Sequence, residues 1–94
     1  MAVFSAVIVH NKNTVKFSRR SKSDIICLKR VTFEAPQGMI GHAILDYQLN
    51  DCDEWKTLGP VQGQQNISVN FWGAEFVTFR ASLPAGCKLY IILD

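Results

Sequence analysis

The chain has 94 residues, of which 48% are hydrophobic and 19% are charged. This length is typical of a single domain, and the apolar content is too high for a disordered segment. No apolar tract is long enough to span a bilayer, and a net charge of +2 is too weak to indicate nucleic acid by itself. The sequence therefore predicts one soluble globular domain over residues 1–94.

The cysteines and the N-terminal run bear on where the protein is made. Cys27, Cys52 and Cys87 stand at long spacings without a C-x-x-C pair. Because an odd number cannot be fully bridged within one chain, they indicate free thiols and a reducing compartment. The run from Val3 to His10 has no basic segment before it and is shorter than a signal peptide. We expect no signal peptide, and we expect this run to be the first strand.

Runs rich in Val, Ile, Phe, Tyr, Trp and Thr alternate with turn-forming clusters about every ten residues. Their alternation of apolar and polar side chains has the period of a strand. The expected strands are Val3 to His10, Val15 to Arg19, Ile25 to Ala35, His42 to Leu49, Trp55 to Leu58, Ile67 to Trp72, Glu75 to Leu83 and Lys88 to Asp94. The first two are expected to form a hairpin, and the acidic stretch Asn50 to Glu54 a hairpin loop. Gly59-Pro60 is expected to end the fifth strand, and Val61 to Gln65 to be a loop.

The third run contains one break in its alternation. Ile25, Cys27, Val31 and Phe33 share one parity, and Lys29 is the exception among them. An inserted residue that shifts the pairing would resolve the conflict. The sequence therefore predicts a β-bulge within this strand.

Seven or eight short strands, without helical periodicity or an internal repeat, predict an all-β fold. The expected architecture is a single-domain antiparallel β-sandwich, and a jelly roll is one form that such a sandwich takes. A small closed barrel is the alternative, because strand count and parity do not separate one curled sheet from two packed sheets.

The last strand is apolar on both faces. Leu89, Ile91 and Leu93 lie on one side, and Tyr90 and Ile92 on the other. On an open edge such a strand would template association with other chains, so it must be covered. It is either the central strand of a monomer or a contact between subunits. We expect a homo-oligomer with Tyr90 and Ile92 at its contact.

Basic residues concentrate between Lys12 and Arg30, where seven stand against Asp24 alone. If the expected hairpin and the strand after it lie together, they form one positive face for phosphates, anionic sugars or an acidic protein. The candidate partner-binding residues there are Lys16, Arg19, Arg20, Lys22, Lys29 and Arg30. Nucleic acid would also require aromatic stacking, whereas the nearby Phe17 and Phe33 have the parity of core residues. An ordinary solvated face, or a docking face for an acidic protein, is therefore favoured over nucleic acid.

The two tryptophans differ in their expected positions. Trp72 falls on the strand face opposite Ile67 and Val69, which favours exposure of its indole, and burial stays the alternative because tryptophan is large and usually mostly buried. An exposed indole on a β-sandwich is a platform on which a sugar ring stacks. The residues to watch for a sugar groove are Trp72, Asn70, Gln48 and His42. Trp55 is expected in the core, because tryptophan is usually mostly buried.

No motif in the chain predicts catalysis or metal binding. His10 and His42 lack Cys, Asp or Glu at metal-ligand spacing, and there is no G-x-S-x-G. The acidic stretch Asp51 to Glu54 lacks the glycine and the terminal spacing of a calcium-binding loop. We expect no enzyme, no catalytic residue, no metal and no cofactor.

The second half of the chain also shows a resemblance to a known group of proteins. The segments that carry it are Tyr47-Gln48-Leu49 with the acidic turn after it, Trp55-Lys56-Thr57-Leu58-Gly59, Ala74 to Arg80 and Pro84 to Tyr90. This cadence of strands and turns, from Ala43 to Asp94, resembles small β-sandwich accessory proteins of tailed-bacteriophage virions. The resemblance implies a structural protein, commonly a trimer, that decorates a capsid or tail, is made in the bacterial host cytoplasm and needs no cofactor.

Three functions are therefore expected, in decreasing order. The first is a structural protein of a virion that decorates or cements a capsid or tail through protein–protein contacts. The second is a lectin-like carbohydrate-binding module that uses an exposed tryptophan. The third is a nucleic-acid-binding domain that uses the basic face between Lys12 and Arg30.

Overall fold

A computed structural model describes residues 4–9, 14–51 and 54–93, and within these ranges the chain forms strands and no helix. The strands are β1 (Phe4–Val9), β2 (Val15–Ser18), β3 (Ile26–Glu34), β4 (Ala43–Leu49), β5 (Lys56–Val61), β6 (Gln64–Phe71), β7 (Phe76–Ser82) and β8 (Lys88–Leu93). A helix with the length and apolarity needed to cross a membrane is not found in the described ranges. The prediction of an all-β fold is confirmed.

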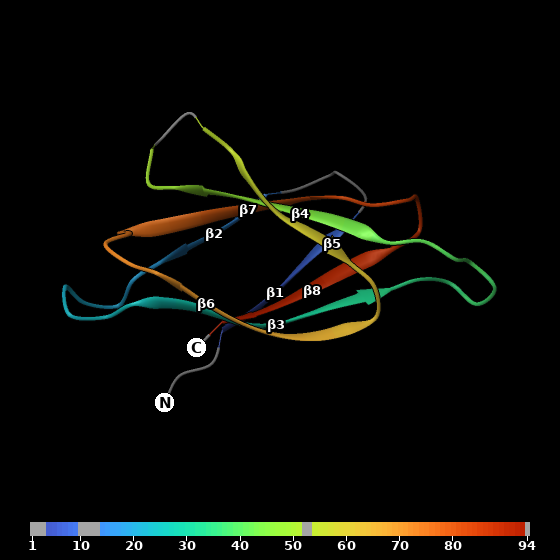
Figure 1. Ribbon diagram of the computed structural model, residues 1–94, viewed down its shortest axis with the longest axis horizontal. Coiled ribbons are helices and arrows are strands. Elements are labelled where there is room, and N and C mark those ends of the chain that lie inside the picture. The colour runs from blue at the N-terminus through green and yellow to red at the C-terminus, as the bar shows by residue number, and fades with distance from the viewer. Residues whose placement is uncertain (1–3, 10–13, 52–53, 94) are drawn as a thin grey trace.

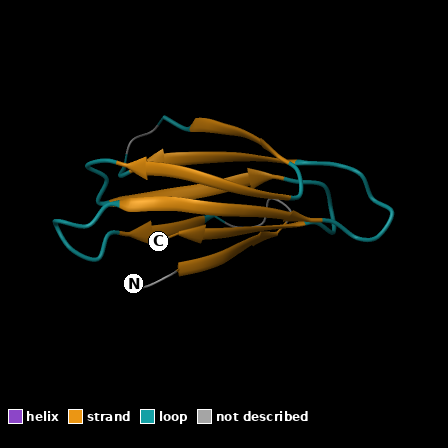
Figure 2. Cartoon of the chain, turned by 60° about the horizontal axis from the view of Figure 1, so that its bottom comes forward, coloured by secondary structure: helices purple, strands orange, loops and turns teal. Residues whose placement is uncertain are grey.

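The strands form two antiparallel sheets that pack face to face (Figures 1 and 2). Sheet A has the order β1-β8-β3-β6, and sheet B has the order β2-β7-β4-β5. The chain resembles a long hairpin folded over itself, because β1 pairs with β8, β2 with β7, β3 with β6 and β4 with β5. This is the strand order of an eight-stranded jelly roll. The predicted β-sandwich is confirmed, and the closed-barrel alternative is wrong.

The space between the sheets is filled by apolar side chains. Among the described residues, no polar or charged side chain is buried. Phe79 of β7 is fully buried, and its ring meets those of Phe17 and Phe71 edge-on at centroid distances of 6.1 and 5.8 Å. Since Phe71 belongs to sheet A and the other two rings to sheet B, this aromatic cluster joins the two sheets.

The last strand is covered within the chain. β8 lies between β1 and β3, and its Leu89, Ile91 and Leu93 are buried in the core. The requirement that this strand be covered is thus met by a central position in sheet A. The predicted contact between subunits through Tyr90 and Ile92 stays a prediction.

The bulge predicted in the third strand is confirmed. The register of β3 with both of its neighbours shifts between Leu28 and Arg30. Before the shift, Ile26 and Leu28 face the core, and after it Val31 and Phe33 do. The parity predicted for Cys27 is wrong, because the bulge follows Leu28 and Cys27 therefore stays outside the core cluster.

The expected hairpin of the first two strands is wrong. β1 belongs to sheet A and β2 to sheet B, so the chain crosses between the sheets instead of turning back. The hairpin around the acidic stretch is confirmed, because β4 and β5 are antiparallel neighbours. The two cases differ because β1 and β2 pair with β8 and β7, which lie near the other end of the chain, whereas β5 pairs with its neighbour in sequence.

The end of the fifth strand and the loop after it were also predicted wrongly. β5 continues through Gly59 and Pro60 to Val61, which is 2% exposed. Proline is tolerated because β5 is an edge strand, where a missing N–H group need not break the ladder. Gln64 and Gln65 pair with β3, so the connection to β6 is shorter than predicted.

Candidate functional site

The predicted contact residues lie on several surfaces of the sandwich. Arg30, Tyr90 and Ile92 are on the outer face of sheet A, whereas Lys16 is on β2 of sheet B. Arg19, Arg20, Lys22 and Trp72 lie in the β2–β3 and β6–β7 connections, and Lys29 is exposed at the bulge of β3. The single positive face expected between Lys12 and Arg30 is therefore divided, and Lys12 itself lies outside the described residues.

The outer face of sheet A carries an apolar strip along β1 and β8. Tyr90 lies opposite Val7 on one side and Thr32 on the other, and Ile92 lies opposite Arg30. Val7 is 38% exposed, while Tyr90 and Ile92 are half-buried. Beyond β3, the same rows continue into exposed polar side chains of β6. We call Val7, Arg30, Thr32, Tyr90 and Ile92 the sheet A face.

The outer face of sheet B is built from side chains that bind one another. The Nε–H group of Arg80 donates to Oδ2 of Asp46 at 3.2 Å, and the hydroxyl of Thr57 donates to Oδ1 of Asp46 at 2.9 Å. The guanidinium carbon of Arg80 lies 4.1 Å from the centroid of the Trp55 ring. Trp55 is half-buried beneath this contact and outside the core, so its predicted core position is wrong. We call Asp46, Trp55, Thr57 and Arg80 the sheet B face.

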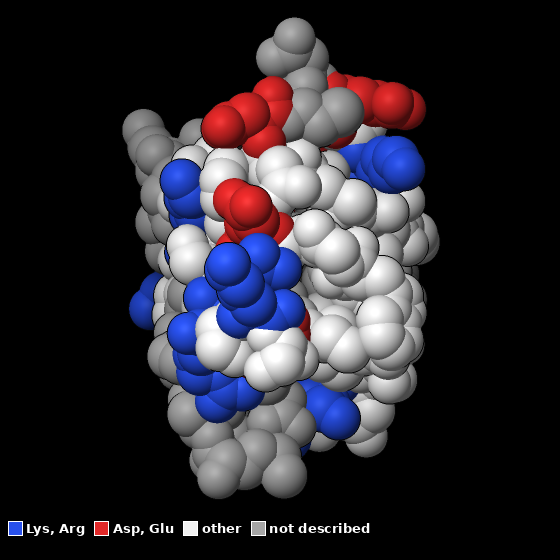
Figure 3. Space-filling view, turned by 90° about the vertical axis from the view of Figure 1, so that its left-hand side faces the viewer, with Lys and Arg blue, Asp and Glu red and all other residues white. Residues whose placement is uncertain are grey.

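At one end of the sandwich, three connections are joined by backbone hydrogen bonds. The backbone N–H of Arg19 donates to the carbonyl of Glu75 at 2.8 Å. Oδ1 of Asn50 accepts from the backbone N–H groups of Glu75 and Phe76, at 2.8 and 3.3 Å. Figure 3 shows this end, with Lys and Arg side chains gathered in the middle and Asp and Glu side chains above them. Trp72 belongs to the same end and is 70% exposed, as its parity predicted.

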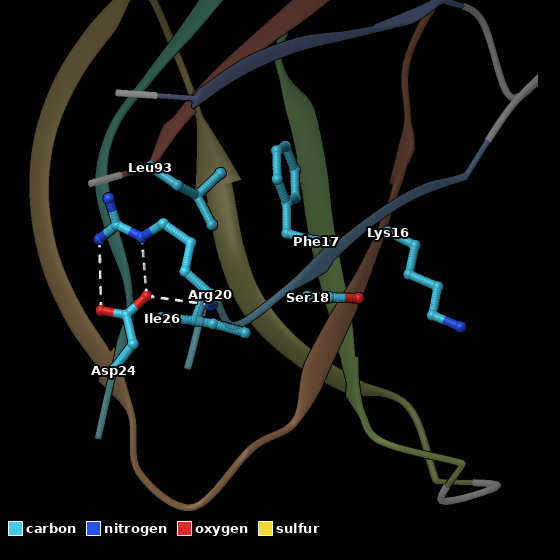
Figure 4. Close-up of a pocket in the computed structure, with 7 residues that line it drawn as sticks. All are labelled: Lys16, Phe17, Ser18, Arg20, Asp24, Ile26 and Leu93. Atoms are coloured by element: carbon cyan, nitrogen blue, oxygen red, sulfur yellow. Dashed lines mark hydrogen bonds and ion pairs between the residues drawn. The ribbon is translucent and has the colours of Figure 1, made fainter. Parts of the chain in front are cut away.

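A cavity of about 210 Å³ opens beside this end, between β2 and the strands of sheet A (Figure 4). Phe17, Ile26 and Leu93 form its apolar part, and Arg20 and Asp24 lie at its rim. The side chain of Arg20 donates two hydrogen bonds to the carboxylate of Asp24, at 2.9 and 3.2 Å. Hydrogen bonds from the Arg20 side chain and backbone lower the pKa of Asp24 from 3.8 to about 2. The hydrogen bonds between Arg20 and Asp24 link two positions within the β2–β3 connection.

The residues proposed for a sugar groove do not converge. His42 precedes β4 and lines an open pocket with Pro60 and Gln62, whereas Trp72 lies at the opposite end of the sandwich. Asn70 is on β6 of sheet A, and Gln48 is on β4 of sheet B. A sugar contact through Trp72 would therefore need other partners from its own end of the molecule.

The cysteines and histidines of the described ranges form no reactive or metal-binding cluster. Cys27 and Cys87 are free and buried, which confirms the thiol prediction for these two, while Cys52 lies outside the described residues. In these same ranges no group of three or more His, Cys, Asp or Glu residues could hold a metal ion. His10 falls outside the described residues.

Sequence reasoning missed some parts of these surfaces. Val7 was not singled out, because its neighbour Tyr90 is at the other end of the chain and only the β1–β8 register brings them together. The contact of Arg80 with Trp55 was missed for the same reason, although the alternation of β7 placed Arg80 on its outer side. The local pattern gave the direction of these side chains but not their neighbours.

The chain was compared with protein-family models and with curated proteins. No protein-family model matches it, and no curated protein matches it. The resemblance to phage accessory proteins therefore rests on the pattern of strands and turns between Ala43 and Asp94.

Proposed function

We propose that the protein is a structural module that decorates or cements a larger protein assembly, with the sheet A face as its contact. The supporting observation is that Val7, Tyr90 and Ile92 form an apolar strip along two paired strands, β1 and β8. The other exposed large apolar side chains of the described residues are dispersed, with Met39, Ile40 and Trp72 in connections and Ile44 on β4. Protein interfaces place apolar and aromatic side chains at the centre and polar side chains at the rim. Here the rim is supplied by Arg30 and by the polar side chains of β6.

The partner is a protein surface that offers a carboxylate beside an apolar patch. Arg30 lies next to Ile92 in the register, so an acidic group on the partner would meet it while apolar side chains cover the strip. The jelly roll is a scaffold of viral capsid domains. With the resemblance to phage accessory proteins, this supports a virion made in a bacterial host as the larger assembly.

Site-specific photo-crosslinking in particles purified from the source cells tests the proposal. A benzophenone side chain is placed at Tyr90, and in a matched control at Thr78, which is half-buried on the interior strand β7 of sheet B. We expect a covalent adduct of the Tyr90 variant with one other protein, identified by mass spectrometry. Equal adducts from Thr78, or adducts only between two copies of this chain, would contradict decoration through the sheet A face.

A second candidate is carbohydrate binding, which the exposure of Trp72 favours. Its indole is 70% exposed in the turn that leads to Glu75, and a sugar ring could stack on it while a carboxylate accepts from the hydroxyls. Glycan-array binding that is lost in Trp72→Ala and kept in Trp55→Ala would support this function. An array without binding would remove it.

Nucleic-acid binding has less support. Some of the basic residues that would carry it lie close together, because Arg20 lines one pocket with Lys16 and another with Lys29. Two of the basic residues, however, have acidic neighbours. Arg20 is paired with Asp24, and Arg19 lies 3.9 Å from the carboxylate of Glu75. These acidic neighbours reduce the positive charge that the segment offers to a phosphate backbone.

A further inference from the structure

β6 is an edge strand of sheet A, and its outer edge has no neighbouring strand in the described chain. It has 8 residues, compared with 4 in β2 and 6 in β5, the edge strands of sheet B. Its side chains alternate regularly, with Ile67 and Val69 half-buried toward the core and Asn66, Ser68 and Asn70 exposed. A long edge of this kind presents a row of backbone groups that can pair with another strand, although its own pairing with β3 shifts register between Val69 and Asn66.

The edges of sheet B have features that oppose such pairing. β2 is short and carries Lys16. β5 contains Gly59 and Pro60 and is paired with a register shift. Charge, proline, short length and irregular pairing are the usual protections of an edge. β6 shares one of these protections, because its pairing with β3 shifts register between Val69 and Asn66, but it contains no charged residue, no proline and no glycine. β1, the other edge of sheet A, is also uncharged but has 6 residues.

We propose that two copies of the chain pair through β6, antiparallel across a twofold axis near Ile67 and Ser68, so that sheet A continues from one copy into the other. Each side chain near such an axis meets a copy of itself or of a close neighbour. Because β6 is uncharged, the twofold brings no like charges together. Polar Asn and Ser side chains would then face one another on the outer side of the joined sheet.

The inner side of the joined sheet also fits this arrangement. Ile67 and Val69 are half-buried at the margin of the core, and a neighbouring strand would remove more of their surface from water. Pairing of β6 with β1 of another copy would be a head-to-tail contact that leaves free edges and continues to grow. The β6–β6 contact closes on itself, which makes a dimer its end point.

This contact is separate from the one in the proposed function. It uses the edge of sheet A, whereas decoration uses the outer face around Tyr90. It also differs from the trimer that the phage resemblance implies. A chain that is crosslinked through Tyr90 but monomeric in solution would refute the dimer alone, and a dimer without a Tyr90 adduct would refute decoration alone.

Sedimentation velocity with charge-swap variants tests the dimer. Ser68 is exposed near the middle of β6, and the two copies of this residue lie opposite or diagonal to each other across the axis. We expect wild type to dimerise with rising concentration, and Ser68→Lys and Ser68→Glu each to weaken the dimer about tenfold, because like charges meet. An equimolar mixture of the two variants should restore the dimer.

The matched control is Ser82→Lys, an exposed serine on the interior strand β7, which should dimerise as wild type does. Wild type that stays monomeric at about 1 mM would overturn the proposal, as would Ser68 variants that dimerise normally, a mixture that fails to recover, or growth beyond a dimer.

Hydrogen exchange of the wild type gives a measurement without variants. Amides of β6 should become protected as concentration rises, and those of β5 should not; equal behaviour of the two strands would contradict the pairing.

Discussion

The outer faces of the two sheets differ in how their side chains are used. On the sheet B face, Arg80 binds Asp46 and covers Trp55, so the charged and aromatic groups have partners within the chain. On the sheet A face, Tyr90 and Ile92 lie beside Val7 and form an apolar strip at the surface. Both faces are built on four antiparallel strands. The two faces therefore differ in how many of their outward side chains have partners within the chain, although the outer face of sheet B also carries the exposed Ile44.

The difference can be traced to the register of the central strands. Arg80 of β7 lies directly opposite Asp46 of β4, so opposite charges meet across two neighbouring strands. On the other sheet, Ile92 of β8 lies opposite Arg30 of β3, and an aliphatic side chain gives that guanidinium no charge to bind. An acidic residue at the position of Ile92 would give Arg30 an opposite charge to bind, as Asp46 does for Arg80 on the other sheet.

The largest expected change in stability comes from a mutation in the core between the sheets, and it tests whether both sheets depend on that core. Phe79 is fully buried and contacts aromatic rings of both sheets. Phe79→Ala should lower the free energy of unfolding by about 3–5 kcal/mol, because it leaves a cavity between the sheets. Urea unfolding followed by tryptophan fluorescence measures the loss. Thr78→Ala on the neighbouring position is the control, and a loss as small as that control's would mean that the sheets do not share this core.

A smaller effect is expected from the network of the sheet B face. Asp46→Ala removes the acceptor of both Arg80 and Thr57 and should cost about 1 kcal/mol. A double-mutant cycle with Arg80→Ala should show coupling that weakens at high salt, since ion pairs near the surface are screened. Additive losses would mean that the two residues do not stabilise each other.

A still smaller effect on the isolated chain is expected at the sheet A face. Tyr90→Ser shortens a half-buried side chain and should cost less stability than Asp46→Ala, about 0.5–1 kcal/mol. The same change should remove most of the chain from purified particles, because it takes the aromatic group from the centre of the proposed contact. Quantitative mass spectrometry of the particles measures the second effect. If the Tyr90→Ser variant were present in the particles in the same amount as wild type, the sheet A face would not be the contact with the particle.

The sequence predicted the parts of the fold that depend on local alternation. The strands, the bulge near Lys29 and the exposure of Trp72 follow from which residues share a parity. The pairing of β1 with β8 did not follow, because it joins the two ends of the chain. Likewise, the sequence predicts that Gly59-Pro60 ends a strand, and only the edge position of β5 explains why the strand continues through Pro60.

The candidate surfaces were predicted less completely than the fold. Tyr90 and Ile92 were identified because an apolar strand with two apolar faces stands out in the sequence. The basic segment was expected to form one face, but the crossing from β2 to β3 carries it from one sheet to the other. Which strand forms an edge depends on the whole topology, so the role proposed for β6 could not be read from its residues alone.

The smallest effect concerns Arg20, which resembles Arg80 in being used within the chain. The pKa of Asp24 is about 2 in the folded protein, below its ordinary value of 3.8, chiefly because the Arg20 side chain donates hydrogen bonds to the carboxylate. A lowered pKa means that the pair stabilises the fold above about pH 3.8, and that this contribution is lost as the pH falls toward 2. Arg20→Ala should therefore raise the pKa of Asp24 toward 3.8 and remove that part of the pH dependence.

Carbon-13 NMR titration of the Asp24 carboxyl group measures this shift directly. Arg19→Ala is the matched control, because Arg19 neighbours Glu75 and should leave Asp24 unchanged. If the pKa of Asp24 stayed near 2 in Arg20→Ala, its backbone hydrogen bonds would be sufficient to hold the carboxylate ionised. The side chain of Arg20 would then contribute little to the ionisation of Asp24, unlike the role inferred for it from its two hydrogen bonds.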